Sequence, residues 1–361
     1  MKLPFLDDFN KSLDKMDGVG REANPPTFWI NTGSYVLNRL ISGSFTRGIP
    51  QGRITSLSGP SASGKSFLLG NLCREAQKDD AFVLVVDSEN ALDTDYLEKI
   101  GVDCSPESFG YVSVGTIPQC QAVVSAFMKQ YKKEYGSDPN APKVLIAIDS
   151  LSMLSSESEV ENYQKGVAKG DQGQRNKQLK SMLRAFTLDI KDCNVAMVNT
   201  VQVYKNQDVT NGEGLYIIPD AVKYAASQIV LVTKLKLRGE AGVEGIRMKC
   251  EGYKTRFTKP FQSATLEVPY DAGIDPFNGL LEAAVGIGVV QQRGAWYVFG
   301  DEKFQSKNFD DYAERILAAC ETQSQTMMTV DVKESELDTS EDSVTAKSKR
   351  MAKLASENDS E

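Results

Sequence analysis

The segment Gly59-Pro60-Ser61-Ala62-Ser63-Gly64-Lys65-Ser66 constrains the fold of this chain more than any other. It matches the pattern G-x-x-x-x-G-K-[ST], which belongs between a strand and a helix. The apolar run Ile54–Ser58 supplies the strand, and a run compatible with a helix follows from Phe67. The sequence therefore predicts a sheet with a phosphate-binding turn at the carboxyl end of one strand.

The chemistry of such a turn is specific. Its glycines let successive backbone N–H groups point at phosphate oxygens, and the helix that follows adds positive potential at its N-terminus. Lys65 is expected to reach the β- and γ-phosphates of ATP, and the Ser66 hydroxyl to bind Mg²⁺. We expect nucleotide contacts from Gly59 through Phe67. A chance match in an ordinary turn is the alternative, and the flanking strand and helix argue against it.

Short apolar runs rich in β-branched residues alternate with helical patterns along the chain. The strands are expected at Ile54–Ser58, Phe82–Val86, Val144–Ile148, Val195–Val198 and Ile229–Val232. The helices are expected at Ser66–Gln77, Gln119–Tyr135 and Gln174–Asp189. This alternation is typical of an α/β fold with a mostly parallel sheet and helices on both faces. Further runs at Ile229–Leu237, Ile246–Cys250 and Ala264–Val268 have few helices between them and predict an antiparallel extension.

Four parts are expected along the chain. Residues 1–27 form a short helix with an apolar face and a linker, residues 28–272 form the core, and residues 273–322 form a small α+β unit. Within this unit we expect a helix near 279–284, a hairpin near 295–299 and a helix at 310–320. Residues 323–361 are acidic and lack aromatic side chains, which predicts a disordered tail. The first helix packs either on its own core or on a neighbouring subunit. The tail is a solubilising segment, a competitor of DNA or a dock for partners.

Composition excludes several kinds of site. The chain has no histidine, so no imidazole can serve as a general base. Its six cysteines form no C-x-x-C pair, which argues against zinc and disulfides and favours a reducing cytosol. The net charge of −8 is not typical of a nucleic-acid-binding protein, but part of the acid excess lies in the tail, so a local basic surface is compatible with it. No apolar run approaches the length of a membrane span.

A phosphate-binding turn needs a carboxylate for magnesium at the end of a neighbouring strand. Asp149 follows the apolar run Val144–Ile148 and is the first choice; Asp87, after Phe82–Val86, is the alternative. Glu89 lies two residues after Asp87. Without histidine, a carboxylate is the natural group to orient an attacking water, so Glu89 is the candidate, and a solvated loop glutamate is the alternative.

Several segments resemble the RecA family of recombinases, and most closely the UvsX recombinases of T4-like bacteriophages. They are residues 30–66 (INTGSYVLNRLISG…GPSASGKS), 86–103 (VDSENALDTDYLEKIGVD), 144–151 (VLIAIDSL), 253–261 (YKTRFTKPF), 273–281 (GIDPFNGLL) and 294–297 (GAWY). The resemblance covers roughly residues 28–320. It implies a RecA-type P-loop core that binds ATP and Mg²⁺.

The resemblance also implies a function. The chain would form helical filaments on single-stranded DNA and pair it with a homologous duplex, hydrolysing ATP at protomer interfaces when DNA is bound. Such a protein would act in repair and in recombination-dependent replication, with a single-strand-binding protein and a loader, in the cytoplasm of a phage-infected bacterium. A ring-forming helicase motor and a non-catalytic DNA-coating protein are the alternatives.

Residue roles follow from the same resemblance. Glu89 falls on the catalytic glutamate of the family, and Asp93 and Tyr96 fall on its adenine contacts. Lys254 and Arg256 fall on a basic pair that reaches the ATP of the adjacent protomer, where positive charge would stabilise the transferred phosphoryl group. A solvated basic face is the alternative for this pair.

Two long loops, near residues 155–173 and 201–218, correspond to the DNA-binding loops of the family. Their candidate DNA contacts are Lys165, Lys169, Arg175, Lys177, Tyr204 and Lys205. Acidic residues in the first loop would oppose phosphate binding. Asn199, Thr200 and Gln202 are expected to couple the nucleotide to these loops. Thr200 occupies the position of a glutamine in the family, so the usual coupling link differs here.

Overall fold

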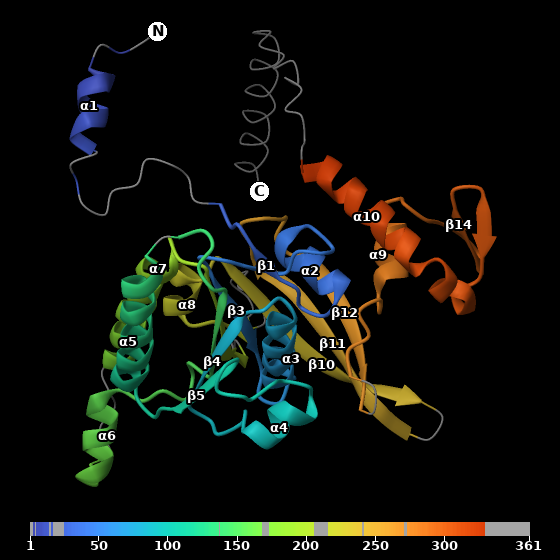
Figure 1. The fold of residues 1–361 in the computed structure, drawn as a ribbon. Helices are drawn as coiled ribbons and strands as arrows, with labels where there is room; N and C mark the ends of the chain where they lie inside the picture. Colours follow the sequence, from blue (N-terminus) through green and yellow to red (C-terminus); the bar gives the residue numbers. More distant parts are fainter. Residues whose placement is uncertain are drawn as a thin grey trace, which may run out of the picture.

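The computed structural model describes residues 3, 5–13, 16, 25–136, 138–167, 173–205, 216–239, 242–270 and 273–328 (Figure 1). Its centre is an eight-stranded sheet with the order β12-β11-β10-β3-β7-β6-β4-β5. The parallel strands are β3 (Ile54–Gly59), β4 (Phe82–Asp87), β5 (Phe109–Ser113), β6 (Val144–Asp149) and β7 (Val195–Gln202). The parallel sheet predicted from the sequence is confirmed, and β5, a partly exposed edge strand, is an addition to it.

Helices cover both faces of this sheet, as its continuously apolar strands require. One face carries α2 (Tyr35–Ser42), α3 (Lys65–Lys78) and α4 (Thr94–Lys99). The other carries α5 (Ile117–Tyr135), α7 (Gln174–Ile190) and α8 (Asp220–Ala225). Each face has its own cluster of buried apolar side chains, so the sheet is enclosed between two cores.

The predicted antiparallel extension is also confirmed. The strands β10 (Gln228–Gly239), β11 (Gly242–Lys254) and β12 (Ser263–Pro269) pair in that order. The first residues of β10 pair in parallel with β3, and the rest of the strand runs on with β11 beyond the parallel sheet. Figure 1 shows this long hairpin projecting from the body of the molecule. The extension thus leaves β12 at one edge of the sheet and β5 at the other.

A smaller unit follows the sheet. It contains α9 (Leu280–Gly286), the strands β13 (Gln291–Arg293), β14 (Trp296–Phe299) and β15 (Glu302–Phe304), a 3-10 helix (Ser306–Asp311) and α10 (Ala313–Met328). Its apolar cluster also takes in Phe45 from the main body. The helix expected at 310–320 begins later and continues to Met328, so the tail boundary at 323 was wrong. Residues 329–361 lie outside the described residues.

The N-terminal helix α1 (Leu6–Leu13) is present and stands apart from the sheet (Figure 1). Phe5 is 59% exposed and Phe9 is 50% exposed, so its apolar face is not packed on the described part of its own chain. Of the two alternatives for this helix, packing on its own core is not what the structure shows. The short strands β1 (Trp29–Ile30) and β2 (Ile49–Pro50) pair beside α2. No described helix is both long and apolar enough to span a membrane.

Candidate nucleotide site

The phosphate loop joins β3 to α3, as predicted. Gly59 has no space for a side chain, because a Cβ there would collide with the carbonyl oxygen of Val232 and lie 2.7 Å from Ser63 Oγ. Gly64 has a φ of +96°, which favours glycine. Both motif glycines are therefore required by the backbone path itself. The loop is closely packed against β10 and β11 before any ligand is considered.

Lys65 is buried at the start of α3. Its Nζ donates to the carbonyl oxygens of Gly59 at 3.0 Å and Pro60 at 2.8 Å. Burial lowers the pKa of Lys65, while the nearby carboxylates of Asp149 and Glu89 act in the opposite direction. A buried ammonium held by neutral carbonyls is under-compensated, and phosphate oxygens would supply the missing negative charge.

The two candidate metal carboxylates differ in their hydrogen bonds. Asp87 is fully satisfied: Oδ1 accepts from the Glu89 N–H at 2.8 Å, and Oδ2 accepts from the Leu92 N–H at 3.1 Å and the Tyr111 hydroxyl at 3.0 Å. Asp149 Oδ1 accepts from the Thr200 hydroxyl, but its buried Oδ2 has no partner among the described residues. Among the described residues, the carboxylate oxygen without a partner therefore belongs to Asp149, as expected of a metal ligand. The Asp87 carboxylate instead accepts hydrogen bonds from the local backbone.

The residues present fit a divalent cation. Burial raises the pKa of Asp149, and the nearby hydroxyls of Thr200 and Ser66 oppose that rise. The Ser66 hydroxyl therefore lies beside Asp149, and the two oxygen donors suit Mg²⁺. No group of three or more acidic, cysteine or histidine residues that could hold a metal occurs within the described ranges. A cation at Ser66 and Asp149 would consequently complete its coordination with phosphate oxygens and water.

Glu89 lies in the turn after β4, facing the end of β6. One of its carboxylate oxygens accepts a hydrogen bond from the Ser150 hydroxyl. The Ser88 hydroxyl in turn donates to the Ser150 carbonyl oxygen at 2.8 Å, and the Ser150 N–H donates to Ser88 Oγ at 3.0 Å. The turns that follow β4 and β6 are therefore bonded to each other, and Glu89 is half-buried beside Asp149 and Lys65 rather than a solvated loop residue.

The residues expected near adenine lie at the start of α4. Asp93 is the N-cap of this helix, and its carboxylate accepts from the Tyr96 N–H at 2.7 Å. Tyr96 is half-buried against the α2–α3 side of the core, and burial raises its pKa. The carboxylate of Asp93 thus has a structural role in this chain, and the ring of Tyr96 keeps one part accessible.

The basic pair lies where the parallel strands begin, which we call the amino edge of the sheet. The phosphate loop lies where these strands end, at the carboxyl edge. Lys254 is opposite Ile229, which is opposite Ser56 near the start of β3. Its Nζ donates to the carbonyl oxygen of Lys223 at 2.5 Å. Burial and then the neighbouring Arg256 lower the pKa of Lys254, and the same two causes, in the same order, lower the pKa of Arg53, which precedes β3. The pair and the phosphate loop of one chain therefore lie at opposite ends of the same strands.

The segment predicted to form the first DNA-binding loop is partly helical. It contains the helix α6 (Glu157–Gln164), which begins with a capping box between Ser156 and Glu159. Lys165 ends this helix and forms an exposed ion pair with Glu161 at 3.2 Å. Lys169 lies outside the described residues. Lys177 is exposed on the first turns of α7.

Arg175 differs from its expected role. Its guanidinium donates to the carbonyl oxygens of Leu154 at 2.9 Å, Leu151 at 3.0 Å and Ser152 at 2.7 Å. These bonds tie the start of α7 to the chain that leaves β6. The prediction that Arg175 contacts DNA phosphates is not supported by this geometry, because its donors face the protein backbone.

The second loop begins and ends in a two-stranded ladder. Tyr204 and Lys205 (β8) pair with Ile217 and Tyr216 (β9), and residues 206–215 lie outside the described residues. Tyr204 is 69% exposed. The ladder brings the two ends of the loop together and presents the Tyr204 side chain to solvent.

The predicted coupling residues lie between this loop and the metal carboxylate. The buried Thr200 donates to Asp149, and its neighbour Asn199 accepts from Ser56 Oγ at 2.8 Å. The Gln202 N–H donates to Ser152 Oγ at 2.8 Å. Strand β7 therefore connects Asp149, through Thr200, to the start of the loop, and the segment after β6 is bonded to the same strand.

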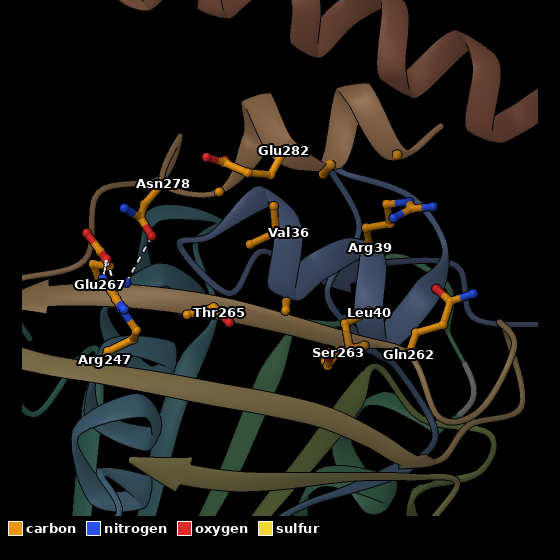
Figure 2. Close-up of a pocket in the computed structure, with 14 residues that line it drawn as sticks. Val36, Arg39, Leu40, Arg247, Gln262, Ser263, Thr265, Glu267, Asn278 and Glu282 are labelled. Carbon is orange, nitrogen blue, oxygen red and sulfur yellow. Dashed lines mark hydrogen bonds and ion pairs between the residues drawn. The ribbon is translucent and has the colours of Figure 1, made fainter. Parts of the chain in front are cut away.

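A separate groove of about 790 Å³ lies between α2, β12 and α9 (Figure 2). Arg247 and Glu267 form an ion pair at one end, where the Asn278 side chain also accepts from the Glu267 N–H at 2.9 Å. Arg39 lies at the other end, over the ring of Phe45. The groove contains none of the residues predicted for nucleotide or DNA binding and is distinct from the phosphate site.

Comparison with known proteins agrees with this geometry. Residues 10–275 match the model of the RecA N-terminal domain. The chain belongs to the RecA family. It is 29% identical to the protein RecA of Thermus aquaticus over 321 residues, which cover 84% of this chain and 86% of that protein. It is 27% identical to the RecA of Chlorobium limicola over 281 residues, covering 76% and 74%, and 27% identical to the RecA of Cereibacter sphaeroides over 290 residues, covering 78% of each.

Family membership establishes the general activity. The chain is an ATP-dependent recombinase of DNA repair and recombination: it forms filaments on DNA, carries out strand exchange and hydrolyses ATP in a DNA-dependent manner. As a member of the family it binds ATP and uses a divalent metal. The expected RecA-type α/β core is confirmed, and the alternatives of a helicase motor and a non-catalytic coating protein are not supported.

Proposed function

We propose that ATP is hydrolysed between two copies of this chain. One copy supplies the phosphate loop, Asp149 and Glu89, and the next supplies Lys254 and Arg256. The observation that carries this proposal is the separation of the two groups within one chain, at opposite ends of the central strands. Head-to-tail stacking brings one edge of the sheet to face the other edge of the next copy, and such contacts build open helical filaments.

The chemistry fits this division. Arg256 is exposed and has no hydrogen bond or ion pair among the described residues, and Lys254 is only half-buried. Cations crowded together in this way repel one another, and negative phosphate from a neighbour would relieve that repulsion. Positive charge added from a second protomer would then stabilise the phosphoryl group during transfer. Hydrolysis would consequently require assembly, and ATP would tighten the assembly in return.

Within the first copy, we assign four roles. Lys65 and the backbone from Gly59 to Phe67 hold the phosphates, and Tyr96 flanks adenine. Ser66 and Asp149 hold Mg²⁺, which would neutralise negative charge on the phosphate oxygens. Glu89, with its carboxylate fixed by the Ser150 hydroxyl, orients the attacking water.

Coupling to DNA follows β7. Thr200 binds Asp149 and lies two residues before Gln202, where the second loop begins. A hydroxyl therefore links the metal carboxylate to the DNA loop, in place of the glutamine of the family. We propose Lys165, Lys177, Tyr204 and Lys205 as DNA contacts, because each is exposed at the start or end of a loop. Lysines would neutralise phosphates and the tyrosine ring would stack on a base.

The wider setting is inferred from the sequence. We propose that the chain is a UvsX-type recombinase of a T4-like phage, acting in the cytoplasm of the infected bacterium with a single-strand-binding protein and a loader. The six cysteines are all free thiols, which suits a reducing compartment. The exposed apolar face of α1 is then expected to pack on the neighbouring copy in the filament.

A complementation experiment tests the shared site. Lys254→Ala and Glu89→Gln proteins are each expected to hydrolyse almost no ATP with single-stranded DNA. In mixed filaments some interfaces combine the intact Glu89 of one copy with the intact Lys254 of the other, so mixing is expected to restore turnover. Activity should peak near equal amounts of the two proteins. An absence of recovery at every ratio, in mixtures that co-assemble by electron microscopy, would contradict the shared site.

A further inference from the structure

A tyrosine on the outermost parallel strand contacts the turn that carries Glu89. Tyr111 lies on β5, at the edge of the sheet, and its hydroxyl donates to Asp87 Oδ2 at 3.0 Å. The Tyr111 side chain is 36% exposed, whereas Asp87 is fully buried. The hydroxyl therefore reaches inward from the surface to a carboxylate that is sealed within the sheet.

The carboxylate of Asp87 holds that turn together through several hydrogen bonds. Its carboxylate accepts from the N–H of Glu89 at 2.8 Å and from the N–H of Leu92 at 3.1 Å, in addition to the Tyr111 hydroxyl. An unsatisfied oxygen on a buried carboxylate costs free energy, so each donor to Asp87 helps to hold the carboxylate in place. Tyr111 supplies the single side-chain donor among the described contacts of Asp87, so the turn depends on a residue from the next strand.

The same strand holds the turn at a second point. Asn90, one residue after Glu89, has a φ of +53°, a conformation that non-glycine residues seldom adopt. The hydroxyl of Ser113, two residues after Tyr111 on β5, donates to Asn90 Oδ1 at 3.5 Å. Strand β5 thus contacts a side chain on each side of Glu89.

We propose that Tyr111 is a positioning residue for ATP hydrolysis. By fixing Asp87, it fixes the peptide N–H of Glu89 and so sets the position of the carboxylate that orients water. The Ser150 hydroxyl holds the end of the Glu89 side chain, and Tyr111, through Asp87, holds its backbone. Small displacements of a catalytic group cost rate, because the reaction requires close alignment. This inference rests on the proposed role of Glu89.

The hydrogen bond is present across the working pH range. Burial, followed by the bond to Asp87, raises the pKa of Tyr111 to about 12, so the phenol stays a donor near neutral pH. The bond can therefore be tested by removing the hydroxyl and not by titration. Tyr111→Phe does this while it keeps the ring.

The first measurement separates turnover from nucleotide binding. In full-length Tyr111→Phe protein with saturating single-stranded DNA, kcat is expected to fall about three- to tenfold, which corresponds to the net contribution of a typical hydrogen bond. The KM for ATP should change by less than about twofold, because the phosphate contacts are intact. The matched control is Tyr131→Phe, which removes a hydroxyl that donates at 2.9 Å to the carbonyl of Pro142, far along α5 from the site. Its kcat should be unchanged.

The second measurement asks whether Tyr111 acts through Glu89. In single-turnover hydrolysis, Tyr111→Phe should cause no further loss in a Glu89→Gln background, because residues that act as one unit are not additive. An additional loss there, an unchanged kcat in the single variant, or an equal loss in the Tyr131→Phe control would overturn the inference. Wild-type turnover in Glu89→Gln alone would instead overturn the proposed role of Glu89, so the two failures are distinguishable.

Discussion

The carboxyl and amino edges of the central sheet, where its parallel strands end and begin, differ in charge and in the groups that remain uncompensated. The carboxyl edge gathers the phosphate loop, Glu89 and Asp149, and it holds a buried carboxylate oxygen that has no partner in the described part of the chain. The amino edge gathers Arg53, Lys254 and Arg256, whose charges oppose one another. Each edge carries charges that would compensate those of the other, but within one chain the length of the strands keeps the two edges apart. The comparison supports the proposal that the site is completed by assembly and not by folding.

The most severe test removes a cation from the amino edge. Lys254→Ala is expected to reduce DNA-stimulated ATP turnover about 10³-fold, the lower end of the effect known for a cation supplied in trans. Binding of a fluorescent ATP analogue by unassembled protein should be unchanged, because the phosphate loop is intact.

The matched control for this variant is Lys129→Ala, which removes an exposed lysine from α5, away from both edges. Its turnover should equal that of the unmodified protein. If Lys254→Ala instead weakened nucleotide binding by unassembled protein, the cation would act within its own chain and the contrast between the edges would fail.

A second test removes a carboxylate from the carboxyl edge. Glu89→Gln is expected to lower kcat at least about 100-fold, the usual effect of losing a positioned base. The amide can still accept from the Ser150 hydroxyl, so the turn should stay folded and ATP should still bind. Rapid-quench measurement of phosphate release gives the rate, and a filtration assay gives ATP binding. A turnover close to that of the unmodified protein would leave Glu89 as a structural residue of the turn.

The sequence was sufficient for the parts of the site that lie close together in the chain. The strand, the loop and the helix around Lys65 follow from a continuous motif, and the position of Asp149 follows from one buried strand. The choice between Asp149 and Asp87 could not be settled in this way. It depends on donors from other strands: Thr200 on β7 for Asp149, and Tyr111 on β5 for Asp87.

Two differences between the sequence analysis and the structure have different causes. The helix α6 was missed although its signal was present, because Ser156 and Glu159 have the spacing of a capping box. Arg175 was expected to contact DNA because a basic residue near a loop is compatible with a phosphate contact or with hydrogen bonds to the backbone, and the structure shows the backbone bonds. Only the positions of the Leu151, Ser152 and Leu154 carbonyls, which the fold determines, distinguish the two.

A third test sharpens the account of the carboxyl edge. Thr200→Val removes the hydroxyl that donates to Asp149 and keeps the shape of the side chain. Because residues behind a metal ligand hold it in position, the Mg²⁺ concentration for half-maximal turnover should rise about tenfold. Thr200→Ser, which keeps the hydroxyl, should restore the original requirement. Equal Mg²⁺ dependence in the valine and serine variants would argue against this link.

The smallest expected effect concerns pH at the amino edge. Burial and Arg256 lower the pKa of Lys254, so its ammonium loses the proton at a lower pH than an ordinary lysine. If the charged form acts on a neighbour's ATP, turnover should decline on the alkaline side earlier than a normal lysine would allow. Arg256→Gln removes one cause of the shift and should move the decline to higher pH, and Lys254→Arg should move it further, because arginine stays charged. An alkaline limb that is identical in all three proteins would mean that another group titrates there, and that Lys254 contributes by position and not by charge.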